Sequence, residues 1–165
     1  MSDHREDHAD RHQFGGPDQL NLAGYPGLGV PADAWTAYTP TIGGTGWALG
    51  NGTFEARYAR IGRTIILHIR CIFGTTSTFG TGALTFTLPT PPTPATLVWH
   101  GHSICSDVGT GFAYGFCQIA GGVLSPWAFF VSGARVGGSQ VTNTQPHTWA
   151  ATDHVTMEIV YEAAA

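Results

Sequence analysis

Three histidines spaced four residues apart near the N-terminus are the first candidates for chemistry. His4, His8 and His12 lie in HREDHADRHQ, and on a helix they would form one stripe. Imidazoles at positions i and i+4 can chelate zinc or nickel. The glutamate of an HExxH site is displaced by one position, since Arg5 and not Glu6 follows His4. We expect a solvated or partner-facing helix and no metal, with a ring of histidines around a three-fold axis left open as a weak metal candidate.

A second histidine pair lies in the sequence WHGHSIC. His100 and His102 would share one face of a strand, with Trp99 and Gly101 on the other. An H-x-H pair supplies two metal ligands, but the sequence places no third. We therefore interpret the pair as polar side chains on the solvent face of a sheet.

The sequence predicts no enzyme and no cofactor. It contains no G-x-S-x-G nucleophile motif, no glycine-rich phosphate loop ending in Lys, and no G-x-G-x-x-G. Asp107 and Glu158 are conceivable glycosidase carboxylates, but spacing in an all-β chain says nothing about the distance between them. Sparse carboxylates of this kind are typical of turns and solvated strand positions.

Composition favours an all-β domain punctuated by glycine. The 165 residues contain 23 Gly and 10 Pro, and only 11% are charged, which argues against both a disordered chain and a helical bundle. All seven basic residues are Arg and the net charge is −4, so we expect no nucleic acid and no membrane partner. No apolar window is long enough for a spanning helix.

The cysteines indicate a reduced protein. Cys71, Cys105 and Cys117 are odd in number and lack CxxC spacing. The N-terminus is charged where a secretion signal would be apolar, so we expect synthesis in a cytoplasm. Whether Cys105 and Cys117 meet depends on a strand register that the sequence does not reveal.

Charge divides the chain into an arm, residues 1–34, and a body, residues 35–165. The arm carries six acidic residues against two Arg. We expect a short helix over residues 2–13, marginal in isolation, and then an extended Gly/Pro-rich segment. That segment, GGPDQLNLAGYPGLGVPA, contains apolar residues without a periodicity of their own, which is typical of a segment that orders by docking on a surface.

The body is predicted to contain about eight strands. TIILHIRCIF alternates apolar and polar residues, and GTFEARYARIGRT precedes it with a turn at Ile61-Gly62. Further strands are expected at 35–38, 83–89, 96–106, 112–120, 123–132 and 154–161, with turns at Gly109–Gly111 and Gly121–Gly122. The predicted inward residues are Ile65, Leu67, Ile69, Cys71, Phe73, Leu84, Phe86, Leu88, Val155, Met157, Ile159 and Tyr161. This pattern is typical of a β-sandwich or jelly roll.

Aromatic residues exceed what one core needs. They are Trp35, Tyr38, Trp47, Trp99, Trp127, Trp149 and the adjacent pair Phe129-Phe130, which must face opposite sides of a strand. Some apolar surface should therefore remain for self-association or for a glycan that stacks on the rings. The candidate ligand or interface aromatics are Trp47, Trp99, Trp127 and Trp149.

Three segments of the body resemble a known family. AWTAYTPTIGGTGWALGNGTFEARYARIGRTIILHIRCIFG, TFGTGALTFTLP and HTWAATDHVTMEIVYEA are similar to the C-terminal β-domain of virion surface proteins, usually labelled minor tail proteins, of tailed bacteriophages of actinobacteria. The similarity covers nearly all of residues 35–165.

The arm carries a separate resemblance. HADRHQFGGPDQL is similar to an H-x3-H-x2-G-G-x-D-x-(Leu/Ile) element of phage tail and fibre proteins. The positions assigned to this attachment arm are His8, His12, Phe14, Gly15, Gly16, Asp18, Leu20 and Leu22. The chain departs from the pattern in the additional His4 and in Pro17.

The resemblance implies a jelly-roll-like homotrimer without catalysis, located in the virion and made in the host cytoplasm. Its partners would be itself and a major capsid or tail protein bound through the arm. Because the chain has neither heptads nor a collagen-like repeat for a shaft, a short spike or capsid decoration protein is favoured. The alternative is a tail-tip adhesin for host attachment, with a cell-surface glycan as ligand.

Overall fold

The computed structural model describes residues 35–92, 96–132 and 135–164. The arm, including the helix expected over residues 2–13 and the three histidines, lies outside these ranges. Within them every regular element is a β-strand and there is no helix, so no helix there is long and apolar enough to span a membrane. The all-β prediction is confirmed.

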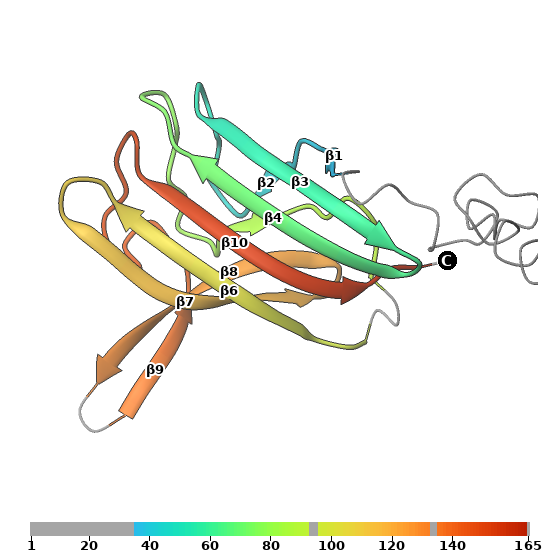
Figure 1. Ribbon diagram of the computed structural model, residues 1–165. Coiled ribbons are helices and arrows are strands. Elements are labelled where there is room, and N and C mark those ends of the chain that lie inside the picture. Colours follow the sequence, from blue (N-terminus) through green and yellow to red (C-terminus); the bar gives the residue numbers. More distant parts are fainter. Residues whose placement is uncertain (1–34, 93–95, 133–134, 165) are drawn as a thin grey trace, which may run out of the picture. The chain divides into compact units, whose positions relative to one another are not determined.

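Ten antiparallel strands form one continuous sheet. They are β1 (Thr36–Ala37), β2 (Ile42–Gly43), β3 (Thr53–Ile61), β4 (Thr64–Ile72), β5 (Thr85–Phe86), β6 (Trp99–Asp107), β7 (Gly111–Ala120), β8 (Val123–Ser132), β9 (Arg135–Gln140) and β10 (His154–Glu162). The order is β1-β3-β4-β10-β6-β7-β8-β5-β2, and β9 pairs with β8 outside this path. The C-terminal strand β10 therefore lies between β4 and β6 in the middle of the sheet (Figure 1).

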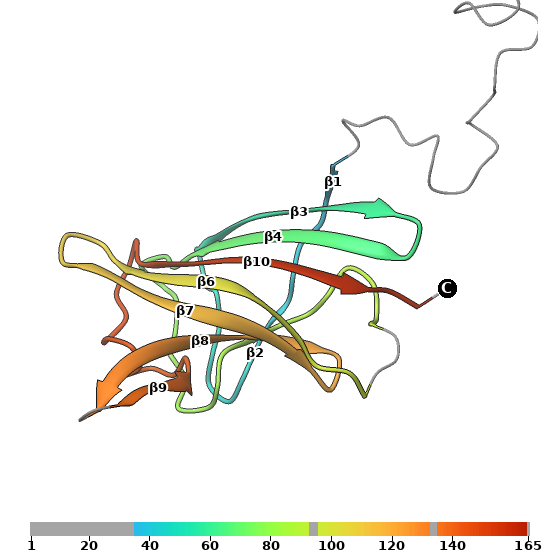
Figure 2. The same ribbon diagram turned by 60° about the horizontal axis from the view of Figure 1, so that its bottom comes forward.

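The sheet curls so that its two ends face each other across the core. Figure 2 shows β3, β4 and β10 on one side and β8, β9 and β2 on the other. Phe54 on β3 contacts Phe86 on β5 with ring centroids 6.0 Å apart, although the two strands are far apart in the strand order. The expected sandwich thus exists as two layers of a single folded sheet.

All eight predicted strands are present, and two short ones were missed. The missed strands are β2 and β9, whose sequences IG and RVGGSQ are rich in glycine, a poor strand former. Their conformation is set by pairing with β5 and β8 and not by local preference. The predicted strand at residues 83–89 contains only the two-residue β5.

Glycine forms the hairpin turns where the sequence predicts them. Gly62 in the β3–β4 turn has a φ of 60°, and Gly121 and Gly122 between β7 and β8 have φ values of 60° and 80°. Two consecutive residues with positive φ are characteristic of the type I′ turn, whose twist matches that of the flanking strands.

The inner faces of β4 and β10 build the core as the period-2 pattern predicts. Alternate residues of both strands are at most 3% exposed. The twelve predicted inward residues are all buried except Leu88, which is half-buried. The core is therefore a continuous apolar layer between the two ends of the curled sheet.

Three thiols belong to this core. Cys71, Cys105 and Cys117 are free and fully buried, on β4, β6 and β7. Burial raises the pKa of each thiol to about 12. Cys105 lies opposite Ala113 and Cys117 opposite Gly101, so the two thiols are not cross-strand neighbours.

Candidate interaction surface

Two of the four tryptophans predicted as ligand or interface residues lie in the core. Trp47 is 7% exposed and Trp149 is 4% exposed. The indole Nε1 of Trp47 donates to Gly82 O at 2.8 Å and that of Trp149 donates to Thr142 O at 2.8 Å. The interpretation of these two residues as surface aromatics is wrong, because both come from loops that fold onto the open end of the sheet.

Trp99 is also a residue of the core edge. It is half-buried, faces inward from β6, and its ring centroid lies 6.4 Å from that of Tyr161. Tyr38 packs in a similar way against Tyr58, with ring centroids 6.0 Å apart. Of the predicted set, Trp127 alone lies on the face of the sheet that turns away from the core, which we call the outer face.

One half of the outer face is charged. It comprises the outward residues of β3, β4 and β10, chiefly Glu55, Arg57, His68, Arg70 and Glu158. Arg70 Nη1 lies 3.4 Å from Glu55 Oε2, and His68 Nδ1 lies 3.3 Å from Glu158 Oε1. Most charges in this charged half therefore have a partner on the neighbouring strand.

Trp35 lies at the margin of the charged half. Its ring makes an edge contact with His68 at 5.0 Å, and the guanidinium of Arg57 lies 5.0 Å from its centroid. A shallow open hollow of about 500 Å³ adjoins it, lined by Ala37, Glu55, Ala56, Arg57, His68, Ile69, Arg70 and Thr156. Mixed charges and an open shape make this hollow a solvated surface and not a ligand pocket.

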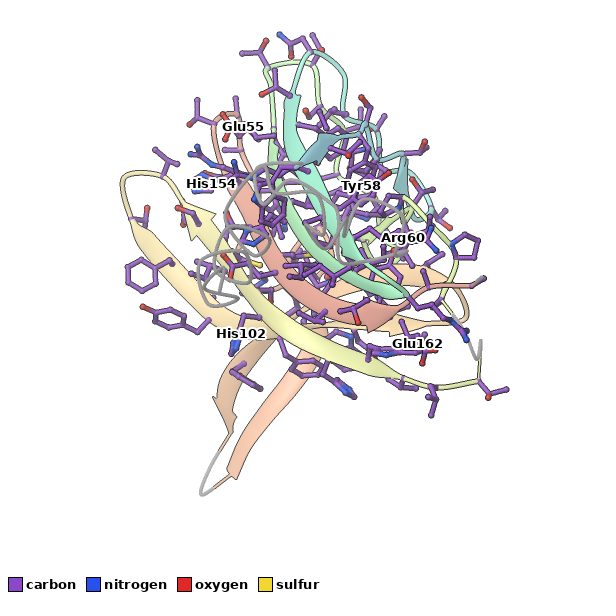
Figure 3. All side chains as sticks on the ribbon, turned by 45° about the vertical axis from the view of Figure 1, so that its right-hand side comes forward. Glu55, Tyr58, Arg60, His102, His154 and Glu162 are labelled. Atoms are coloured by element: carbon purple, nitrogen blue, oxygen red, sulfur yellow. The ribbon has the colours of Figure 1, made fainter. Side chains whose placement is uncertain are left out.

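The other half of the outer face is aromatic. On β6, β7 and β8 six apolar side chains point outward and form what we call the aromatic strip: Ile104, Phe112, Tyr114, Phe116, Trp127 and Phe129. Phe112 and Tyr114 are 63% and 61% exposed. Figure 3 shows aromatic rings projecting beside the β6–β7 region near the labelled His102.

The rings of the aromatic strip form two groups of contacting side chains. Phe116 stacks on Trp127 with centroids 5.2 Å apart and an interplanar angle of 16°. Phe129 lies 5.7 Å from Phe116, and Phe112 lies 5.0 Å from Tyr114. The expectation that the Phe129-Phe130 pair exposes one ring holds for Phe129, whereas the side chain of Phe130 lies outside the described set. The strip thus consists of two groups of rings that follow one another along the outward side of β7.

The sequence did not single out Phe112, Tyr114 and Phe116, although the alternation in GFAYGFCQIA was visible. The three rings of this strand face outward, and Ala113, Gly115, Cys117 and Ile119 face the core. A β-carbon on Gly115 would collide with the backbone carbonyl of Trp127. Because the inner side of β7 is closely packed at Gly115, it has no room there for a large side chain. The rings of β7 therefore point outward.

His100 and His102 are exposed on the outer face, as predicted. His100 packs against Phe116 with centroids 5.6 Å apart, and His102 lies between Glu158 and Phe116 in the strand register. Among the residues that the structure describes, no group of three His, Cys, Asp or Glu side chains could hold a metal ion. The two histidines mark the border between the aromatic strip and the charged half.

The geometry excludes Asp107 and Glu158 as a glycosidase pair. Glu158 lies opposite His102, five residues from Asp107 along β6, which is roughly 16 Å in an extended strand. The two residues also alternate onto opposite faces of the sheet. Paired glycosidase carboxyls are about 5 to 9.5 Å apart.

Asp153, the most buried carboxylate of the described residues, has a structural role. Asp153 accepts hydrogen bonds from Val108 N at 2.9 Å and from Ala150 N at 2.7 Å. Its Oδ2 lies 3.7 Å from His147 Nε2, too far for a hydrogen bond. Asp153 thus ties the β6–β7 turn to the loop before β10.

The predicted attachment residues of the arm lie outside the described ranges, so the aromatic strip is the candidate site that the structure places. No family model, no curated protein and no solved structure matches the chain. The proposed function therefore rests on the fold and on the aromatic strip.

Proposed function

We propose that this protein is a non-enzymatic structural protein of a tailed-phage virion surface, a homotrimeric decoration or spike protein held to the particle by its N-terminal arm. The observation that carries the proposal is the aromatic strip. Exposed apolar surface gathered on one side of a domain is characteristic of an interface, and covering rings that are about half exposed or more is favourable.

The size of the aromatic strip suits self-association. With 150 to 250 Å² for each large aromatic side chain, the exposed parts of Phe112, Tyr114 and Phe129 present about 350 Å² of apolar surface. Stable interfaces bury about 800 Å² on each partner and place an apolar core inside a polar rim. The strip has the dimensions of such a core, with His100 and His102 along its rim.

Two further observations support a structural role. The body contains five acidic residues and five Arg, so it presents no strong field to a charged substrate or to nucleic acid. The acidic arm and the resemblance of both arm and body to phage virion proteins agree with attachment to a particle.

Immunogold electron microscopy of the phage particles that encode this chain tests the proposal. An antibody raised against residues 35–165 is expected to label particle heads in many copies, as a capsid decoration protein requires. Labelling confined to the tail tip would favour the adhesin. Intact particles that carry no label would contradict both assignments.

The adhesin remains a second candidate because of the stacked pair Phe116 and Trp127. Flat rings bordered by hydrogen-bonding histidines resemble the platforms on which sugar rings stack. Binding of the fluorescent protein to host cells distinguishes the two functions. If Tyr114→Ala removes cell binding and leaves the oligomer intact, the strip is a glycan site. If it weakens the oligomer, the strip is an interface.

A further inference from the structure

The sheet forks where β8 leaves β7. Residues 115–120 of β7 pair with residues 123–128 of β8, and from Phe129 to Ser132 β8 pairs only with β9. β7 continues to Gly111 beside β6. The end of β8 and β9 thus diverge from the sheet as a two-stranded hairpin (Figure 1).

The fork exposes unprotected strand edges. In the described part of the chain, Gly111–Tyr114 of β7 and Phe129–Ser132 of β8 have no partner on the sides that face the fork. Neither stretch, GFAY or FFVS, contains a proline or a charged residue. Natural edge strands are normally guarded by such residues against pairing with other chains. Unguarded edges beside the aromatic strip indicate a surface that another strand covers.

The hairpin itself is incomplete. A two-stranded hairpin is marginal in water and needs a third strand or a packing surface. At its base Trp127 Nε1 and Ser139 Oγ are buried and have no hydrogen-bond partner. Both atoms are already inaccessible in one copy, so a docking chain would not reach them. The case for a neighbour rests on the hairpin having only two strands.

We propose that the β8–β9 hairpin of one copy docks in the fork of the next, where β9 adds to the open edge Gly111–Tyr114 of β7 and the hairpin covers the aromatic strip. This deepens the self-association in the proposed function and rests on it. Donor and acceptor are different surfaces, so the contact is head-to-tail, and three such contacts related by a three-fold rotation make the closed trimer of the proposed function. The strip alone offers about half of the area that a stable interface needs, and the added strand supplies the rest.

Two variants separate the acceptor from the donor. Tyr114→Arg places a charge in the fork and leaves the hairpin intact. Replacing residues 130–137 by Asn-Gly, a favoured two-residue turn, removes the hairpin and leaves the acceptor edge of β7 intact. Val160→Arg is the matched control, since Val160 is 53% exposed on β10, outside the strip. Circular dichroism verifies that each variant is folded.

Light scattering after gel filtration gives the masses. We expect the wild type and Val160→Arg at three times the 17.5 kDa chain mass, and each of the other two variants at the mass of one chain. An equimolar mixture of the two monomeric variants restores one contact, between the hairpin of Tyr114→Arg and the acceptor edge of β7 in the shortened chain. The mixture should therefore form a dimer of two chains and stop there.

The outcomes distinguish the two levels of the proposal. A shortened chain that remains trimeric, or a mixture that remains monomeric, overturns hairpin exchange and leaves self-association through the strip in place. A monomeric wild type overturns the self-association on which the inference rests.

Discussion

The charged half and the aromatic half of the outer face belong to one sheet and share one core, yet their outward residues differ in kind. In the charged half, Glu55 lies beside Arg70 and Glu158 beside His68 on neighbouring strands. In the aromatic half, Phe112 and Tyr114 contact each other and are more than half exposed. One half pairs most of its charges within a single copy, and the other leaves apolar rings exposed, which is the basis of the proposed self-association.

The difference shows that strand alternation does not by itself identify the buried face. On β4 and β10 the larger apolar residues face inward, as the usual pattern predicts. On β7 the inner side is occupied by Ala113, Gly115, Cys117 and Ile119, and the rings face outward. A strand with apolar residues on both faces can therefore contribute to a core and to an interface at the same time.

The largest expected effect is on the free energy of unfolding at high pH, and it comes from the three thiols in the core below both halves. Unfolded thiols ionise near pH 9, while Cys71, Cys105 and Cys117 stay protonated in the native state until about pH 12. Their stabilising contribution is complete below pH 9 and is lost as the pH rises towards 12, by about 1 kcal/mol for each thiol and pH unit. Urea denaturation at stepped pH measures this.

Thiol labelling of the native protein compares the halves. Cys71 lies under the charged half, and Cys105 and Cys117 lie under the aromatic half. If both halves form one cooperative sheet, a thiol reagent modifies all three at the same slow rate in the native protein. Faster labelling of Cys117 than of Cys71 would contradict a shared core and show that the aromatic half opens separately.

A smaller effect is expected from two alanines in β7. Gly115→Ala forces a β-carbon against Trp127 O, whereas an alanine at Gly111 meets nothing within 4 Å. We expect Gly115→Ala to lower the free energy of unfolding by about 2 to 3 kcal/mol, and Gly111→Ala to change it by no more than about 0.5 kcal/mol. Equal midpoints in urea would refute the explanation given for the outward rings.

The smallest effect should come from the charged half. Glu55 and Arg70 are exposed and 3.4 Å apart, so Arg70→Ala is expected to cost at most about 1 kcal/mol, an amount that salt reduces. Oligomer mass should not change, because this pair lies outside the aromatic strip. Loss of the oligomer in Arg70→Ala would indicate that the interface lies in the charged half, and it would contradict the proposal.

The sequence was sufficient to predict the strands with strict alternation, and it was insufficient to predict the aromatic strip. Val155, Met157, Ile159 and Tyr161 are recognisable as one buried face because solvent and core impose period 2 on a central strand. Trp47 and Trp149 were predicted as surface residues because the sequence contains more aromatic rings than one core needs, and their burial depends on how their loops close over the sheet.

The orientation of β7 and the existence of β9 depend on tertiary contacts that no local pattern encodes. Gly115 is needed because a β-carbon at this position would collide with the carbonyl of Trp127, a residue on another strand. β9 is a strand because β8 pairs with it, despite two central glycines. Such long-range constraints appear only when the register is known.

The most direct test of the central claim is the solution mass of three proteins, measured by sedimentation velocity: the wild type, Tyr114→Arg in the aromatic half, and Val160→Arg in the charged half. If the aromatic half is the self-association surface, the wild type and Val160→Arg sediment as trimers and Tyr114→Arg sediments as a folded monomer. A wild type that sediments as a single 17.5 kDa chain, or a Tyr114→Arg protein that remains trimeric, would contradict it.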